Sequence, residues 1–207
     1  MTRRTRGDLN DRDRGRGSDM RAREDRLRIA QTAARLIVEH GLTDWSLAKR
    51  KAARQLMLAA SASFPSDAEI EEALSAHHAL FGGEAHAATL RSQRTQALAW
   101  MKRLAAWSPL LVGGVAAGWA TEHSDLRLEV VADDAKAVEI ALANAGIRYA
   151  ALPSRDADTG AHLLVETPRI GVRILIVTPQ QRRNRPRRDD EPRLEATAVE
   201  ALLSPPA

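Results

Sequence analysis

The stretch LLVGGVAAGWATEHSDLRLEVV, residues 110–131, decides the fold of this 207-residue chain. It opens with three apolar residues that run into two glycines, a pattern typical of a short buried strand followed by a turn. A short helix and a loop are expected next. After Asp125 the residues alternate, with Leu126, Leu128 and Val130 on one face, which predicts a second strand. Two strands joined through a glycine-rich turn are therefore expected to begin an α/β domain.

The residues that follow predict one helix and three more strands. The segment DDAKAVEIALANAG, residues 133–146, has an aspartate to cap its start, an apolar face and a glycine to end it. The strand candidates are RYAAL, AHLLVET and VRILIVT, residues 148–152, 161–167 and 172–178. This order predicts a mixed β-sheet covered by helices over residues 109–179.

Upstream, residues 24–108 have apolar residues at helical spacing, which predicts four amphipathic helices. The first ends at Gly41, the second is capped by Asp44, and the third follows a capping box of Ser66 and Glu69. We expect the four helices to form a small bundle, so that the chain is an α+β protein with a helical N-terminal part. The side chains expected to be buried in the third and fourth helices are Ile70, Ala73, Leu74, His77, Leu80, Phe81, Leu90, Ala97, Leu98, Met101, Leu104 and Ala105.

Two arginine-rich segments lie outside these elements. Residues 1–23 mix Arg, Asp and Gly with almost no apolar residues, which predicts a disordered tail. Residues 180–194 contain QQRRNRPRRDDEPR, whose prolines and charges predict a loop, and residues 195–207 predict a closing helix and tail. Both arginine-rich segments have two interpretations. Residues 1–23 are either a solvated tail or a contact for RNA or an acidic partner, and residues 180–194 are either a surface loop or a contact for phosphate or RNA.

Composition excludes several classes of protein. The chain has no cysteine, which rules out disulfides, thiolate zinc sites and a cysteine nucleophile. Its longest apolar run, residues 110–120, is too short to span a bilayer and no signal peptide is recognisable, so we expect a cytoplasmic protein without membrane contact. The net charge of +4 is compatible with nucleic-acid binding, but it also suits an arginine-rich composition with no such role.

At the opening stretch the sequence resembles a known family. Gly113, Gly114, Gly118, Ser124 and Asp125 fall in order on the signature of the nucleotidyltransferase superfamily: a strand ending in two glycines, a further glycine, then Ser-Asp before the next strand. PRIGVRILIVTP, residues 168–179, is similar to the strand that carries the third carboxylate in family X DNA polymerases. The resemblance covers about a third of the chain. It implies a glycine turn that approaches phosphate and carboxylates that hold two magnesium ions.

The residues that should hold metal depart from that pattern. Asp125 stands as the first acid, but Arg127 replaces the second and Gly171 the third. Glu129 lies on the same face of the strand, and Arg127 is expected to form ion pairs with both acids. We therefore predict a degenerate, non-catalytic site without metal. It would bind a nucleotide or a macromolecular partner through Gly113, Gly114, Gly118, Ser124, Arg127, Arg182 and Arg183.

Two alternatives stay open. The first is an active, magnesium-dependent nucleotidyltransferase that uses Asp125 and Glu129 with an unusual third ligand. The second is a DNA-binding regulator, because residues 28–49 resemble the first helix and turn of TetR-type regulators. Residues 46–60 lack the glycine turn that would place a recognition helix. DNA is therefore a less expected partner than a nucleotide or RNA. A P-loop is excluded, because Trp119 and Ala120 stand where Lys and Ser or Thr are needed.

Overall fold

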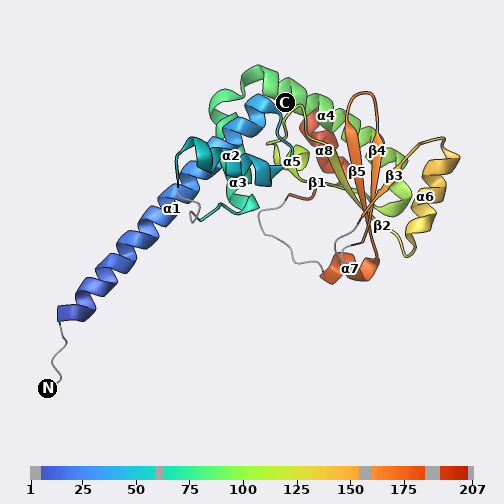
Figure 1. Ribbon diagram of the computed structural model, residues 1–207. Coiled ribbons are helices and arrows are strands. Elements are labelled where there is room, and N and C mark those ends of the chain that lie inside the picture. The colour runs from blue at the N-terminus through green and yellow to red at the C-terminus, as the bar shows by residue number, and fades with distance from the viewer. Residues whose placement is uncertain (1–5, 59–62, 154–159, 185–191, 205–207) are drawn as a thin grey trace. The chain divides into compact units, whose positions relative to one another are not determined.

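The computed structural model describes residues 6–58, 63–153, 160–184 and 192–204, with side chains from residue 19 onward. The chain divides into two compact units, Met1–Phe81 and Gly82–Ala207 (Figure 1).

The first unit consists of three helices, α1 (Arg6–His40), α2 (Trp45–Gln55) and α3 (Asp67–Phe81). Helix α1 packs against both others, and its buried residues include Ile29, Ala33 and Ile37. The predicted helix ends are confirmed. Gly41 has a φ of 60° after α1, Asp44 accepts a hydrogen bond from Leu47 N at 3.1 Å, and Ser66 and Glu69 cap each other reciprocally.

Two expectations for this unit need correction. Helix α1 begins at Arg6, where a disordered tail is expected from the sequence. Adding a residue to an existing helix costs far less than starting a new one, and no proline interrupts residues 6–23. At the other end of the unit, Leu80 and Phe81 are 76% and 73% exposed and His77 is half-buried, so the end of α3 lacks the burial predicted for it.

The second unit is built on a five-stranded sheet with the strand order β1-β2-β5-β4-β3. The strands are β1 (Leu110–Val112), β2 (Leu126–Val131), β3 (Ala150–Leu152), β4 (Ala161–Glu166) and β5 (Gly171–Val177). Strands β2 and β5 pair in parallel, and the other neighbours are antiparallel. The sheet is therefore mixed, and the predicted α+β class is confirmed.

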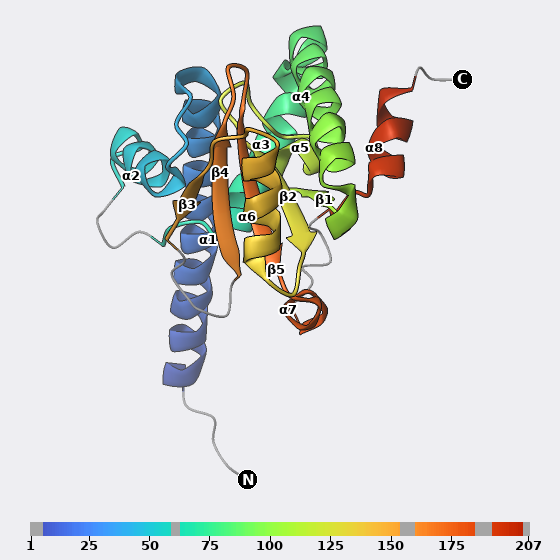
Figure 2. The same ribbon diagram turned by 90° about the vertical axis from the view of Figure 1, so that its right-hand side faces the viewer.

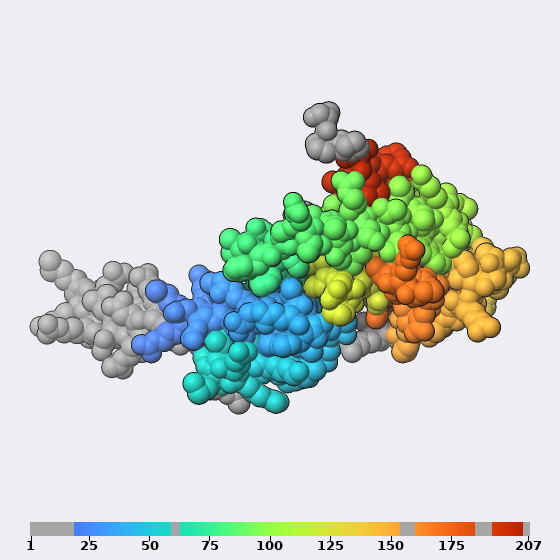
Figure 3. Space-filling view, turned by 90° about the horizontal axis from the view of Figure 1, so that it is seen from above, coloured from blue at the N-terminus to red at the C-terminus, as the bar shows by residue number. Residues whose placement is uncertain are grey.

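One face of the sheet is buried under helices α4 (Gly83–Arg103), α6 (Ala135–Asn144) and α8 (Ala196–Leu203) (Figure 2). Leu126, Leu128 and Val130 of β2 share this core with every second residue of β5. Figure 3 shows α4 and α8 side by side on the surface of this unit. The prediction that α4 joins an N-terminal bundle over residues 24–108 is therefore wrong, since its apolar face covers the sheet. Ala105, which follows α4 in the short 3-10 turn η1 (Ala105–Trp107), is exposed.

The sheet is followed by a further helix where a loop is predicted. Helix α7 (Pro179–Asn184) begins with a proline, which suits the first turn of a helix. Thr178 and Gln181 form a second capping box: Thr178 N donates to Gln181 Oε1 at 2.8 Å, and Gln181 N donates to Thr178 Oγ1 at 3.1 Å. Leu194 then pairs with Leu111 of β1, and residues 185–191 lie outside the described part of the chain. The prediction of a single loop over 180–194 is therefore corrected at both of its ends.

Among the residues that the structure describes, no helix is both long enough and apolar enough to cross a lipid bilayer.

Candidate functional site

The glycine turn has a backbone that other residues would strain. Gly113 has a φ of 69° and precedes the four-residue helix α5 (Gly114–Ala117), and Gly118 ends that helix with a φ of 92°. L-residues rarely adopt such values. At Gly114 the constraint is space, because a Cβ there would lie 2.6 Å from Cζ3 of the Trp119 ring. The three glycines of the predicted motif are thus explained by the local geometry of the turn.

Helix α4 holds this turn in place through three side chains. His86 Nε2 hydrogen-bonds to the carbonyl oxygen of Gly118 at 3.0 Å, and Arg94 Nε donates to that of Val115 at 3.2 Å. Gln93, which is buried, donates to the carbonyl oxygen of Thr121 at 2.7 Å. Burial lowers the pKa of the Arg94 guanidinium from its ordinary value. No sequence signal links α4 to the turn, and these residues were not predicted.

Ser124 lies in the loop that leads into β2. Its hydroxyl oxygen accepts a hydrogen bond from Thr121 N at 3.0 Å, and its own N–H donates to the carbonyl oxygen of Thr121 at 3.0 Å. The side chain therefore closes the turn that places Asp125 at the start of β2.

Asp125 is bound by an arginine of the neighbouring strand. The parallel register pairs Leu126 with Val172, which sets Asp125 opposite Gly171. Arg173 Nε donates to Asp125 Oδ2 at 2.6 Å. The two side chains are 30% and 49% exposed for Asp125 and Arg173. The first predicted acid is thus held by Arg173, an arginine that the sequence does not identify as its partner.

Arg127 lies against the glycine turn. A Cβ added to Gly113 would be 3.0 Å from Arg127 Cδ, so the aliphatic part of the side chain crosses that glycine. Its register partner on β5 is Arg173. Arg127 is exposed, and no described residue forms an ion pair or hydrogen bond with its guanidinium. The expected ion pairs of Arg127 with Asp125 and Glu129 are therefore wrong.

Glu129 is buried, with its side chain 2% exposed, and two arginines from beyond β5 face it. Arg182 Nε of α7 donates to Glu129 Oε1 at 3.0 Å, and Arg193 Nη1 lies 3.9 Å from the same oxygen. Arg182 also donates through Nη2 to the carbonyl oxygen of Ser108 at 3.1 Å. Arg182, predicted to bind nucleotide, thus anchors α7 to the sheet, whereas Arg183 is exposed on the same helix.

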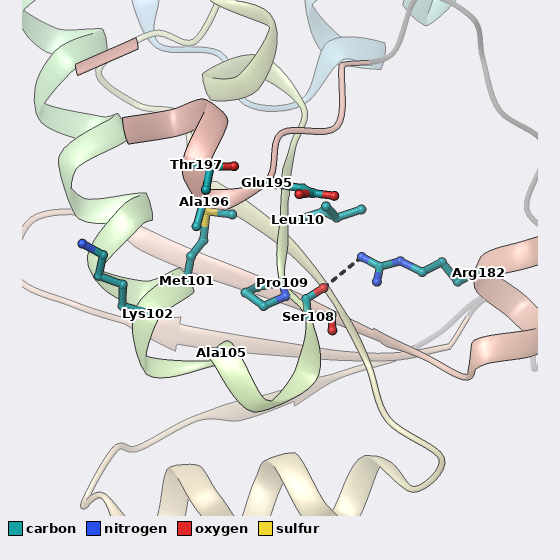
Figure 4. A pocket seen from close by; sticks show the side chains of 10 residues that line it. All are labelled: Met101, Lys102, Ala105, Ser108, Pro109, Leu110, Arg182, Glu195, Ala196 and Thr197. Atoms are coloured by element: carbon teal, nitrogen blue, oxygen red, sulfur yellow. Dashed lines mark hydrogen bonds between the residues drawn. The ribbon is translucent and has the colours of Figure 1, made fainter. Parts of the chain in front are cut away.

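A pocket of about 450 Å³ lies beside this ion pair, between the end of α4, the start of β1 and the first turn of α8. Figure 4 shows Arg182 reaching toward Ser108, with Glu195 and Leu110 close to it. The apolar side of the pocket is formed by Met101, Ala105, Pro109, Leu110 and Ala196. Arg182 therefore faces both the buried Glu129 and this pocket.

The residues do not fit a pair of magnesium ions. Asp125 and Glu129 are each engaged by arginine, and Gly171 offers no ligand in place of the third acid. A metal ion needs converging oxygen ligands without competing positive charge. Among the residues whose side chains are described (19–58, 63–153, 160–184 and 192–204), no three His, Asp or Glu side chains are grouped to hold a metal ion.

No protein-family model matches the chain, and comparisons with curated proteins and with solved structures find no significant match. The resemblance to nucleotidyltransferases therefore stays a prediction that rests on the residues themselves.

Proposed function

We propose that this protein binds a phosphate-bearing nucleotide at the open face of β2 and β5 without metal, and that it does not catalyse nucleotidyl transfer. The observation that carries the proposal is the position of Arg127. Its exposed guanidinium lies next to the glycine turn, has Arg173 as its register partner, and is not neutralised by any described residue.

Positive charge here takes the place that metal holds in the family that the sequence resembles. Guanidinium groups bind phosphate through two parallel hydrogen bonds and keep their charge at every physiological pH. Arg127 and Arg173 are side by side on adjacent strands, so a phosphate group can contact both. The half-buried residues Val112 and Leu164 flank this pair in the sheet register and offer apolar surface to a sugar or base.

The ion pairs of the two acids support a binding role over a catalytic one. Catalysis with magnesium would require Asp125 to leave Arg173, and Glu129 to leave both Arg182 and Arg193. For the buried Glu129, removing its partners leaves a charge unpaired, at a cost of about 3–5 kcal/mol. The Asp125–Arg173 pair is partly exposed, so breaking it costs less, up to about 1 kcal/mol. The active-enzyme alternative therefore needs a large rearrangement that the binding proposal does not.

Calorimetric titration of the full chain with ATP, GTP and inorganic triphosphate, each in EDTA and in magnesium, tests the proposal. We expect binding in EDTA, and roughly tenfold weaker binding for Arg127→Gln, equivalent to about 1.4 kcal/mol. Arg148→Gln is the matched control, because Arg148 is exposed just before β3 at the far edge of the sheet. Inorganic triphosphate separates phosphate recognition from contacts to the nucleoside.

Three results would contradict the proposal. One is the absence of binding to any of the three ligands. Another is equal loss of affinity in Arg127→Gln and Arg148→Gln, which would indicate a general charge effect. The third is label transfer that requires magnesium and disappears in Asp125→Ala, which would establish the active enzyme instead.

A further inference from the structure

Helix α2 exposes a ridge of positive charge that the nucleotide site does not use. Its exposed residues are Ser46, Arg50, Lys51, Arg54 and Gln55, and the helix contains no acidic residue. The opposite side of the helix is made of small apolar residues, Ala48, Ala52 and Ala53, which are buried within the first unit. The helix is thus fixed by one face and presents cations on the other.

The three cations of this basic ridge, Arg50, Lys51 and Arg54, have no ion pair with any residue that the structure describes. The fourth cation of α2 behaves differently: Lys49 Nζ lies 2.7 Å from Asp67 Oδ1 at the start of α3. On α1, Arg26 and Arg28 also have carboxylate neighbours, Glu69 and Asp25, each at 3.8 Å. Acids are therefore available in this unit, but they do not neutralise the ridge.

The ridge fits a phosphate backbone better than a membrane surface. A helix that binds a bilayer presents large apolar side chains to the lipid, and none of the exposed residues of α2 is apolar. Arg50 and Arg54 are one turn apart, a rise of about 6 Å along the helix. One strand of duplex DNA presents a phosphate every 3.4 Å or so along its axis, so both arginines can meet the same strand.

The segment between α2 and α3 argues against sequence-specific contacts to the bases of DNA. Residues 56–66 separate α2 from α3, whereas a helix-turn-helix joins its two helices by a short turn that places the second in the major groove. The missing turn removes a recognition helix but leaves the phosphate contacts intact. Contacts of this kind fix a protein on nucleic acid without reading its sequence.

We infer that the Arg50, Lys51 and Arg54 ridge of α2 binds the phosphate backbone of a nucleic acid independently of its sequence. The inference stands apart from the nucleotide site, since α2 belongs to the first unit and Arg127 to the second.

The experiment measures fluorescence anisotropy of the full chain with a labelled 20-base-pair DNA duplex and a labelled 20-nucleotide single-stranded RNA, over a salt series. The test variant is Arg50→Ala/Lys51→Ala/Arg54→Ala. The matched control is Arg21→Ala/Arg23→Ala/Arg35→Ala, which removes the same charge from exposed positions of α1. Circular dichroism and thermal unfolding establish that both variants keep their helices.

We expect the α2 variant to lose at least tenfold in affinity at low salt and the control to lose much less. For the duplex, the slope of log K against log salt should fall in magnitude by about 2.7, since each phosphate contact contributes about 0.9. Scrambling the base sequence should change nothing. Stronger binding of one of the two nucleic acids identifies the source of the phosphates, and either preference supports the inference.

Equal losses in the two triple variants would overturn the inference, because net charge alone would then explain binding. Binding to vesicles with 30% phosphatidylserine but to neither nucleic acid would overturn it in favour of a membrane. The α2 variant is expected to keep the nucleotide affinity of the wild type, so failure of the nucleotide proposal and failure of this one are distinguishable.

Discussion

Gly171 lies against the carboxylate of Asp125, so closely that a Cβ on Gly171 would overlap Oδ1 of that side chain. The contact follows from the parallel register of β2 and β5, which sets the two residues opposite each other. By resemblance, a nucleotidyltransferase would carry its third acid at the position of Gly171. Here the first carboxylate occupies the space that a side chain at that position would need.

The first prediction is that Gly171→Ala destabilises the protein by about 1 kcal/mol, because the Asp125 carboxylate, the end of a partly exposed side chain, must shift and loosen its ion pair with Arg173. In an Asp125→Ala background the same change should cost less than about 0.5 kcal/mol, because the overlapping carboxylate is gone. Urea denaturation of the four proteins in this double-mutant cycle measures the coupling. Strictly additive effects would show that Asp125 does not limit the space at Gly171.

The second prediction concerns the charge of Asp125. Its removal should change nucleotide affinity in opposite directions for metal-free binding and for a magnesium-dependent enzyme. Asp125→Asn removes a negative charge beside Arg127 and weakens the hold on Arg173, so nucleotide binding in EDTA should tighten by roughly fivefold. A metal ligand would behave in the reverse way, with affinity lost on the same substitution. Calorimetry in EDTA and in magnesium compares the two, and Asp133→Asn, an exposed carboxylate beyond the other end of β2, is the control.

The third prediction is that Glu129→Gln destabilises the protein by about 3 kcal/mol, since it leaves Arg182 and Arg193 without their buried counter-charge. Chemical denaturation gives the loss in the free energy of unfolding. Glu166→Gln should change it by less than about 0.5 kcal/mol, as expected for an exposed surface position. A loss as small as that of the control would mean that Glu129 does not anchor α7.

The fourth prediction is a pH dependence at the start of α3. A hydrogen bond from the backbone N–H of Ser66 holds the pKa of Glu69 below its ordinary value. The carboxylate is therefore favoured in the folded state, and its stabilising effect is present above the unfolded pKa and lost as the pH falls through the folded pKa. Glu69→Ala should cost about 1 kcal/mol at pH 6, and the difference from the wild type should shrink toward pH 3.

Urea denaturation of the wild type and Glu69→Ala at several pH values measures this trend. The control is Glu72→Ala, at an exposed position of the same helix. Its difference in stability from the wild type should not shrink as the pH falls. A difference that stays constant down to pH 3 would contradict the capping role of the Glu69 carboxylate.

Elements marked by local chemistry could be predicted from the sequence, and those set by distant packing could not. Asp134 caps α6 by accepting from Lys136 N at 2.9 Å, and Gly146 follows the helix with a φ of 68°. Both signals are read within a few residues. The apolar face of α4 was also recognised, but a helical period states only that a face is buried and not which element buries it. The assignment of α4 to a bundle failed for this reason.

The candidate site shows the same division. The glycine turn was predicted because its conformation depends on Gly113 and Gly118 themselves. The partners of the acids were not, because Arg173 lies 48 residues from Asp125 and Arg182 lies 53 from Glu129. Strand register brings these pairs together. Arg127 is nearer to both acids in sequence, yet its side chain crosses Gly113 instead.

The Glu129 carboxylate contacts an arginine on each side of residues 185–191. Glu129 faces Arg182 before that segment and Arg193 after it, while Leu194 pairs with Leu111. We expect a single proteolytic cut between those two arginines to leave two fragments that remain associated, because Val199 of α8 packs in the hydrophobic core. We therefore expect the fold to tolerate new termini placed between Arg182 and Arg193.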